Sequence, residues 1–206
     1  MVKGDGIMTD TYKNYEELKY NELIGYTYRI EAHLQSRVYA VIAPHGGGIE
    51  VGTSELARAV AKDEHTLYLF EGLKSSDNAT LHITSTNFDE PIARMIVPEH
   101  EYGVSLHGMK GDEPLTLVGG SNTILVGEIV YSLKVWGFNA EVAEDHLAGK
   151  DPSNIVNIAS HGGVQLEIST AQRKAFFEGG DWSKANRGNT TQAFDDYVKA
   201  IREILY

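Results

Sequence analysis

The segment that most constrains the fold runs from an apolar stretch at residues 38–43, through a glycine-rich loop, to a helical pattern at 53–61. The apolar stretch is typical of a buried strand, and the spacing of apolar residues at 53–61 is typical of an amphipathic helix. A strand that is joined to a helix by a short loop is the building unit of α/β sheets. This segment therefore predicts an α/β fold.

The rest of the chain continues the alternation of strands and helices. Strand-like runs occupy residues 66–70, 80–83, 102–107, 115–119, 154–158 and 163–168, and helical patterns occupy 123–134, 170–177 and 190–205. A chain of 206 residues buries one core comfortably. We predict one domain, residues 1–206, with a mixed, largely parallel, open central sheet flanked by helices. Residues 1–32 are expected to be an N-terminal lead-in that packs on the core, with a short helix capped by Asn14.

Composition excludes several classes of function. The chain has no cysteine, so any metal must be held by His, Asp or Glu. Its formal net charge of -11 disfavours binding to nucleic acid or to anionic membranes. No run of 18 apolar residues and no N-terminal apolar signal region is present. We expect a monomer that is made in the cytoplasm. Any action outside the cell would then follow release by lysis.

Two histidines and a carboxylate stand at the predicted carboxyl ends of strands. His45 and Glu50 flank the loop residues 46–49, and His107 ends a later strand. Two imidazoles, one carboxylate and a water form the open, four-coordinate arrangement of a catalytic zinc site. A second carboxylate is then needed to take the water proton and return it to a leaving amine, and Glu167 is the best candidate. These residues predict a hydrolase with one zinc ion.

The order and setting of these four residues resemble the poly-γ-glutamate hydrolase family of phages and bacilli, which is similar to a trimmed zinc carboxypeptidase. The similarity spans residues 38–177, and the element Gly-Gly-Val-Gln-Leu-Glu-Ile around Glu167 is its most diagnostic part. The resemblance implies that His45, Glu50 and His107 bind zinc, that Glu167 is the general acid and base, and that γ-glutamyl bonds of poly-γ-glutamate are cleaved. The zinc carboxypeptidases space the first pair as His-x-x-Glu, whereas four residues intervene here.

A polyanionic substrate requires local cations on so acidic a chain, because only charges inside the cleft escape screening by salt. Arg94 and Arg173 are the first candidates, since a guanidinium can bind a carboxylate with two hydrogen bonds. Asn87 and Lys110 are weaker candidates. His161 either orients the substrate or lies on the surface of a loop.

Alternatives to this interpretation stay open. The same four residues would serve a zinc amidohydrolase or peptidase that acts on small N-acyl amino acids or on peptidoglycan crosslinks. A non-enzymatic virion or surface module would hold its metal structurally, with a fourth protein ligand in place of water. His82 is expected to be a half-buried imidazole with a polar partner rather than a ligand, because it alternates with apolar neighbours.

Overall fold

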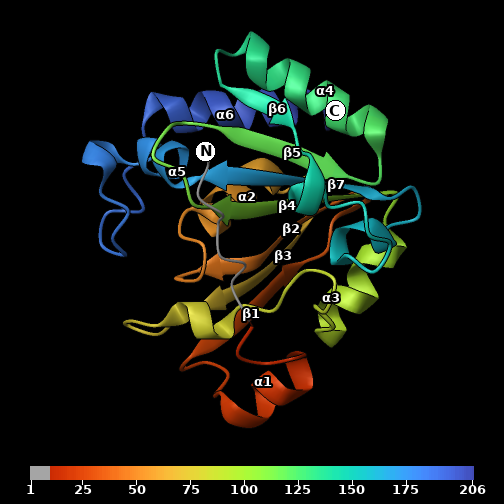
Figure 1. The fold of residues 1–206 in the computed structure, drawn as a ribbon, viewed down its shortest axis with the longest axis vertical. Helices are drawn as coiled ribbons and strands as arrows, with labels where there is room; N and C mark the ends of the chain where they lie inside the picture. The colour runs from red at the N-terminus through yellow and green to blue at the C-terminus, as the bar shows by residue number, and fades with distance from the viewer. Residues whose placement is uncertain (1–9) are drawn as a thin grey trace.

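The computed structural model describes residues 10–206, apart from the side chain of His146, and contains a seven-stranded sheet with helices on both faces (Figure 1). The strands are β1 (Tyr28–His33), β2 (Ser36–Gly47), β3 (His65–Gly72), β4 (Tyr102–Met109), β5 (Thr116–Gly120), β6 (Ala140–Val142) and β7 (Gly163–Ser169). Their order in space is β1-β3-β2-β4-β7-β5-β6. The central strands β3, β2, β4 and β7 are parallel, whereas β1 is antiparallel to β3 and β5 is antiparallel to β7. The predicted single-domain α/β fold with a mixed, largely parallel, open sheet is confirmed.

The helices pack in two groups, one on each face of the sheet, and each group forms a hydrophobic cluster with the face that it covers. They are α1 (Tyr15–Asn21), α2 (Thr53–Ala61), α3 (Pro91–Ile96), α4 (Thr123–Val135), α5 (Thr170–Ala175) and α6 (Gln192–Arg202). The larger cluster joins α2, α4 and α6 to the sheet, and the smaller one joins α1 and α3 to the opposite face. Figure 1 shows α1 beside β1 at one edge of the sheet and α4 beside β6 at the other. Among residues 10–206, no helix is both long and apolar enough to cross a bilayer.

Two predicted strands are wrong, because local turn chemistry outweighs their β-branched content. The segment expected at 80–83 overlaps the end of the 3₁₀ helix η1 (Asn78–Leu81), and the one expected at 154–158 contains the 3₁₀ helix η4 (Ile155–Ile158). The Asn78 side chain bonds the backbone of Lys74, and the Asn154 side chain accepts the amide of Val156. Such side-chain bonds to the nearby backbone favour turns over strands.

The N-terminal segment is more closely built into the core than predicted. Its short helix is confirmed as α1, with the Asn14 side chain accepting the amide of Glu17. Residues 28–33, however, form β1 and lengthen the sheet, and Tyr28 stacks on Phe70 of β3 with the ring centroids 5.1 Å apart. Residues 1–9 of the predicted lead-in lie outside the described residues.

The sheet topology determines where a site can form. Strands β2, β4 and β7 are neighbours and parallel, so their carboxyl ends meet at one edge. Leu106 and Leu166 pack in the larger cluster. Because side chains alternate along a strand, His107 and Glu167 therefore point to the opposite face. These two residues are also directly paired in the register of β4 and β7.

Candidate active site

The glycine-rich loop after β2 folds back so that Glu50 returns to His45. The Glu50 amide donates to the His45 carbonyl at 2.9 Å, and the Gly47 amide donates to the Ser54 hydroxyl at 2.9 Å. Gly47 has a φ of 66°, and a Cβ there would lie 2.5 Å from the carbonyl oxygen of Gly72, so the turn requires glycine. The loop brings Glu50 Oε1 to 3.3 Å from His45 Nδ1. The four intervening residues are thus absorbed by the turn.

Strand β4 adds the third predicted ligand to this pair. His107 Nδ1 lies 3.1 Å from His45 Nδ1 and 3.7 Å from Glu50 Oε2. The Gly108 amide donates to Glu50 Oε2 at 2.9 Å and so fixes the carboxylate. The side chains of His45, Glu50 and His107 are all buried. The structure therefore brings the three predicted metal ligands together.

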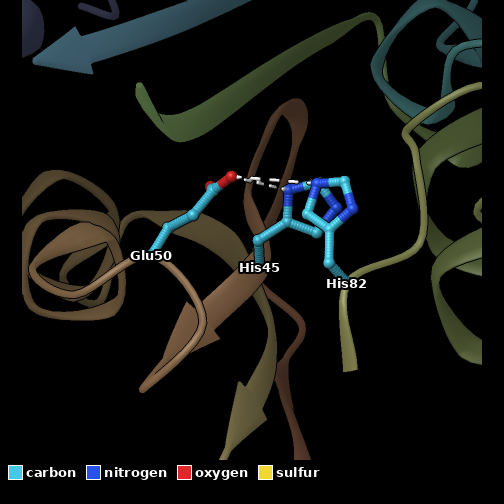
Figure 2. Close-up of side chains that lie close together, drawn as sticks. All are labelled: His45, Glu50 and His82. Atoms are coloured by element: carbon cyan, nitrogen blue, oxygen red, sulfur yellow. Dashed lines mark ion pairs between the residues drawn. The ribbon is translucent and has the colours of Figure 1, made fainter. Parts of the chain in front are cut away.

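A fourth residue of the cluster, His82, was not predicted as part of the site. Its Nε2 lies 3.9 Å from Glu50 Oε1, and its ring centroid lies 4.0 Å from that of His45 (Figure 2). His45, Glu50 and His82 each offer a ligand atom, and these atoms lie within 4.8 Å of one another. His82 Nδ1 lies 2.7 Å from Asp10 Oδ1, and Asp10 Oδ2 accepts the Thr84 amide at 2.7 Å. His82 thus has the polar partner that was expected, but this partner lies 72 positions away and could not be found from spacing.

The hydrogen bonds indicate which ring nitrogens are free. His45 Nε2 lies 2.8 Å from the carbonyl oxygen of Ile83, which can only accept, so Nε2 carries a proton; in the neutral form of the ring, the form that binds a metal, Nδ1 is then the atom with the lone pair. Asp10 likewise receives the Nδ1 proton of His82 and leaves Nε2 free, and burial lowers the pKa of His82 to about 4, which keeps the ring neutral. The Nδ1 of His107 faces the Nδ1 of His45. Metal-binding histidines usually donate their second N–H to a carbonyl or carboxylate, as His45 and His82 do here, whereas the buried Nε2 of His107 has no hydrogen-bond partner among the described residues.

This set of donor atoms fits a zinc ion. Ligands on tetrahedral zinc, at bond lengths of about 2.0–2.1 Å, lie roughly 3.3–3.4 Å apart. The two histidine Nδ1 atoms are 3.1 Å apart, His45 Nδ1 is 3.3 Å from Glu50 Oε1, and His107 Nδ1 is 3.7 Å from Glu50 Oε2, and these distances lie around this value. Burial alone would raise the pKa of Glu50, but the two neighbouring imidazoles outweigh it and hold this pKa well below its usual range. Glu50 is therefore an anion, as a ligand must be.

Glu167 lies next to the cluster and has the opposite electrostatic character. Burial raises the pKa of Glu167, and the charge of Glu50 adds to this effect while His107 opposes it. The Gln165 side chain donates to Glu167 Oε1 at 3.1 Å, which leaves the second oxygen available. Two carboxylates whose pKa values are displaced in opposite directions can take different roles in one site. Glu50 suits a permanent anion, and Glu167 suits a group that gains and loses a proton.

These residues open onto a cavity of about 740 Å³. That volume is within the range of pockets that bind small ligands. The cationic lining residues, within the part of the chain that the structure describes, are Lys110 and Lys150. Both are exposed, and neither forms an ion pair with a described residue. The acidic lining residues besides Glu50 and Glu167 are Asp145 and Asp151.

The structure does not bring the other predicted substrate-binding residues to the cavity lining. Arg94 is exposed on α3, and Asn87 is exposed in the loop before it. The ring of His161 packs at a tilt against that of Tyr102 at the amino end of β4, the end opposite His107. Arg173 is buried, and its guanidinium donates to three backbone carbonyls rather than into the cavity. The tertiary structure sets how far each side chain lies from the cavity, which its sequence position does not reveal.

An open α/β sheet with a buried carboxylate beside a histidine cluster at the strand ends fits a hydrolase. The sequence model of the family described as poly-gamma-glutamate hydrolase matches residues 12–200. The chain belongs to the poly-γ-glutamate hydrolase family, which confirms the predicted resemblance and the predicted enzyme class.

Relatives and solved structures agree with this membership. The chain is 46% identical to YmaC of Bacillus subtilis (strain 168) over 201 residues, which cover 95% of this chain and 84% of YmaC. It is similar to the structure of a bacteriophage poly-γ-glutamate hydrolase, with a TM-score of 0.94, 52% identity and coverage of 96% and 97% of the two chains. It is also similar to YndL in a zinc-free apo form, with a TM-score of 0.90, 40% identity and coverage of 96% and 98%. The likeness to zinc carboxypeptidases stays a prediction.

Proposed function

We propose that the protein hydrolyses γ-glutamyl amide bonds of poly-γ-glutamate, with one zinc ion held by His45, Glu50 and His107 and with Glu167 as general acid and base. The observation that carries this proposal is that His45 Nδ1 and His107 Nδ1 lie 3.1 Å apart and each lies within 3.7 Å of one oxygen of Glu50, beside a carboxylate of raised pKa. The bacteriophage poly-γ-glutamate hydrolase, at 52% identity over nearly the whole chain, supports the substrate.

The protein's own residues would share the reaction as follows. When bound, zinc supplies a Lewis acid that polarises a carbonyl and lowers the pKa of water. Glu167 takes a proton from the attacking water on its free carboxylate oxygen and returns it to the leaving nitrogen. Gln165 holds the other oxygen of Glu167 and so fixes the direction of proton transfer. The Gly108 amide holds Glu50 in place during the cycle.

The substrate is a polyanion, and two lysines of the cavity are suited to bind it. Lys110 and Lys150 are unpaired among the described residues, so their ammonium groups are free to bind side-chain carboxylates of the polymer. Such a contact at 4 Å corresponds to about 1 kcal/mol in water and about 4 kcal/mol at the lower effective dielectric of a protein surface. Replacing either lysine by methionine should raise KM and leave kcat nearly unchanged. Lys134→Met, on the exposed face of α4, is the matched control.

The central experiment combines metal analysis with cleavage of γ-linked polymer, followed by chain length or viscosity. The purified protein should contain one zinc ion per chain, lose activity with a chelator and regain it when zinc is added. Full activity after complete removal of metal would reject the zinc assignment. Cleavage of N-acyl amino acids or peptidoglycan crosslinks, with the γ-linked polymer left intact, would instead favour a zinc amidohydrolase.

His82 tests the choice of ligands. Its Nε2 lies 3.9 Å from Glu50 Oε1, and His107 Nδ1 lies 3.7 Å from Glu50 Oε2, so either histidine could complete a site with His45 and Glu50. We keep the set predicted from the sequence and assign His82 to the cavity wall. His107→Ala should abolish zinc binding, whereas His82→Ala should keep zinc and lower turnover. Equal loss of zinc in both variants would make His82 a ligand. His33→Ala, at an exposed edge position of β1, controls for the loss of an imidazole.

A further inference from the structure

The guanidinium of Arg173 joins three segments of the chain that are far apart in sequence. Arg173 is 5% exposed. Its Nε donates to the carbonyl oxygen of Ile168 at 3.0 Å, its Nη1 to that of Val51 at 2.8 Å and its Nη2 to that of Met109 at 3.2 Å. All three acceptors are backbone atoms. A planar group with five donors in a fixed fork can hold three carbonyls at once, which the ammonium of a lysine cannot do with the same geometry.

Each of these carbonyls lies close in sequence to a residue of the proposed site. Val51 follows Glu50, and Ile168 follows Glu167. Met109 ends β4, two positions after His107. The guanidinium therefore holds three stretches of backbone. Two of them lie beside the predicted ligands Glu50 and His107, and the third lies beside the predicted general base Glu167.

The position of the guanidinium is itself closely defined. A Cβ on Gly108 would lie 2.5 Å from Arg173 Cζ, so the guanidinium lies directly against the Gly108 backbone. The Gly108 amide donates to Glu50 Oε2. Arg173 Cζ also lies 5.3 Å from the ring centroid of Trp182, which is close enough for a cation–π contact. Arg173 is thus confined between this ring and the strand end that binds Glu50.

We infer that Arg173 is a positioning residue, which fixes Glu50, His107 and Glu167 relative to one another through the backbone without contacting the substrate. This inference rests on the proposed function for its catalytic readout. Its structural readout, the protection of the Gly108 amide, does not depend on metal or on substrate. Loss of the guanidinium should loosen the three strand ends and expose the hydrogen bond from Gly108 to Glu50.

The test compares Arg173→Met and Arg173→Lys with Arg202→Met. Arg202 is a suitable control because it is also buried and also donates to a backbone carbonyl, that of Val60 at 2.6 Å, but on α6. In the metal-free protein, exchange of the Gly108 amide should be at least tenfold faster in both Arg173 variants and unchanged in Arg202→Met. Unchanged exchange in the Arg173 variants would overturn the inference, whatever the protein hydrolyses.

The same variants separate positioning from substrate binding. Loss of groups that orient metal ligands commonly weakens metal affinity or activity by about 10–100-fold. We expect that loss in zinc affinity and in kcat for Arg173→Met, with KM nearly unchanged, and no such loss for Arg202→Met. A raised KM with kcat intact would instead make Arg173 a substrate-binding residue. A wild-type protein without zinc or polymer cleavage would reject the proposed function and leave the exchange result to decide the role of Arg173.

A double-mutant cycle tests the packing against Gly108 directly. Gly108→Ala should slow turnover strongly when Arg173 is present, because the new methyl group meets the guanidinium. In the Arg173→Met background, where the more flexible side chain can move aside, the same substitution should lower turnover by a several-fold smaller factor. Equal costs in the two backgrounds would contradict the inferred position of the guanidinium.

Discussion

Replacing Glu167 with glutamine separates proton transfer from every other property of the site. Glutamine keeps the size of the side chain and an oxygen that can accept from Gln165, which donates to Glu167 Oε1 at 3.1 Å. It cannot take a proton from water at neutral pH. General acid–base catalysis contributes roughly 10²–10⁴-fold, so kcat should fall by that factor, or about 3–5 kcal/mol of activation free energy.

The same substitution should not destabilise the fold. Burial raises the pKa of Glu167, so its ionised form is less favourable in the folded protein than in water. The cost in folding free energy is absent at a pH below the pKa of Glu167 in the unfolded chain and is fully present at a pH above its raised pKa in the folded protein. Glutamine carries no charge and avoids it. Metal-free Glu167→Gln should therefore melt at the same temperature as the wild type, or higher, at neutral pH.

The assay measures three quantities on one preparation: zinc content, melting temperature without metal, and steady-state cleavage of γ-linked polymer. Glu128→Gln, on an exposed position of α4, controls for the chemical change itself and should leave all three unchanged. A zinc-loaded Glu167→Gln variant with wild-type kcat would refute the assigned role. Loss of zinc from the variant would indicate instead that Glu167 is a metal ligand.

Two further predictions concern ionic contacts around the site and at the sheet edge. Asp10→Ala removes the two carboxylate oxygens that bind the His82 ring and the Thr84 amide. Each hydrogen bond to a charged group contributes about 1.5–3 kcal/mol to the free energy of unfolding. The variant should melt at a lower temperature and lose turnover in the same direction as His82→Ala, and wild-type turnover would exclude the orienting role. Arg58 donates to Glu31 at 2.7 Å and to Glu71 at 3.0 Å and contributes to the lowered pKa of both carboxylates. The two ionised carboxylates stabilise the fold fully above their unfolded pKa of about 4.3, and this stabilisation is lost as the pH falls through their lower folded pKa. The loss of unfolding free energy in Arg58→Gln, measured in urea, should therefore be smaller at pH 3 than at pH 7. A deficit that does not change with pH would contradict this.

The sequence predicted the elements whose signals are local. The long helix at 123–134 appears as α4, with the Asn122 side chain accepting the amide of Leu125, because capping and helical periodicity act within a few residues. The segments at 80–83 and 154–158 were assigned wrongly for a related reason. In both, asparagine side chains bond the nearby backbone, and this competes with the β propensity on which the prediction relied.

By itself, the sequence determined the residue types of the site and the strands that carry them. His45, Glu50, His107 and Glu167 could be selected because each lies near or just after the carboxyl end of a strand-like run, and parallel strands present their carboxyl ends at one edge. Only the tertiary structure decided which side chains complete and support this group. The bond from Asp10 to His82 spans 72 positions, and such contacts depend on how distant segments pack. No periodicity or spacing along the chain records that packing.

The role of Arg173 belongs to the same category. Its position one turn into the helix after Glu167 suggested a cation for the substrate, but its bond to the Val51 carbonyl crosses 122 positions and turns the side chain into the protein. A buried guanidinium must satisfy its donors, and the carbonyls within reach are set by the meeting of β2, β4 and β7. The chemistry at the strand ends could be predicted from the sequence, whereas the residue that holds those ends together became visible only once the strands were placed side by side.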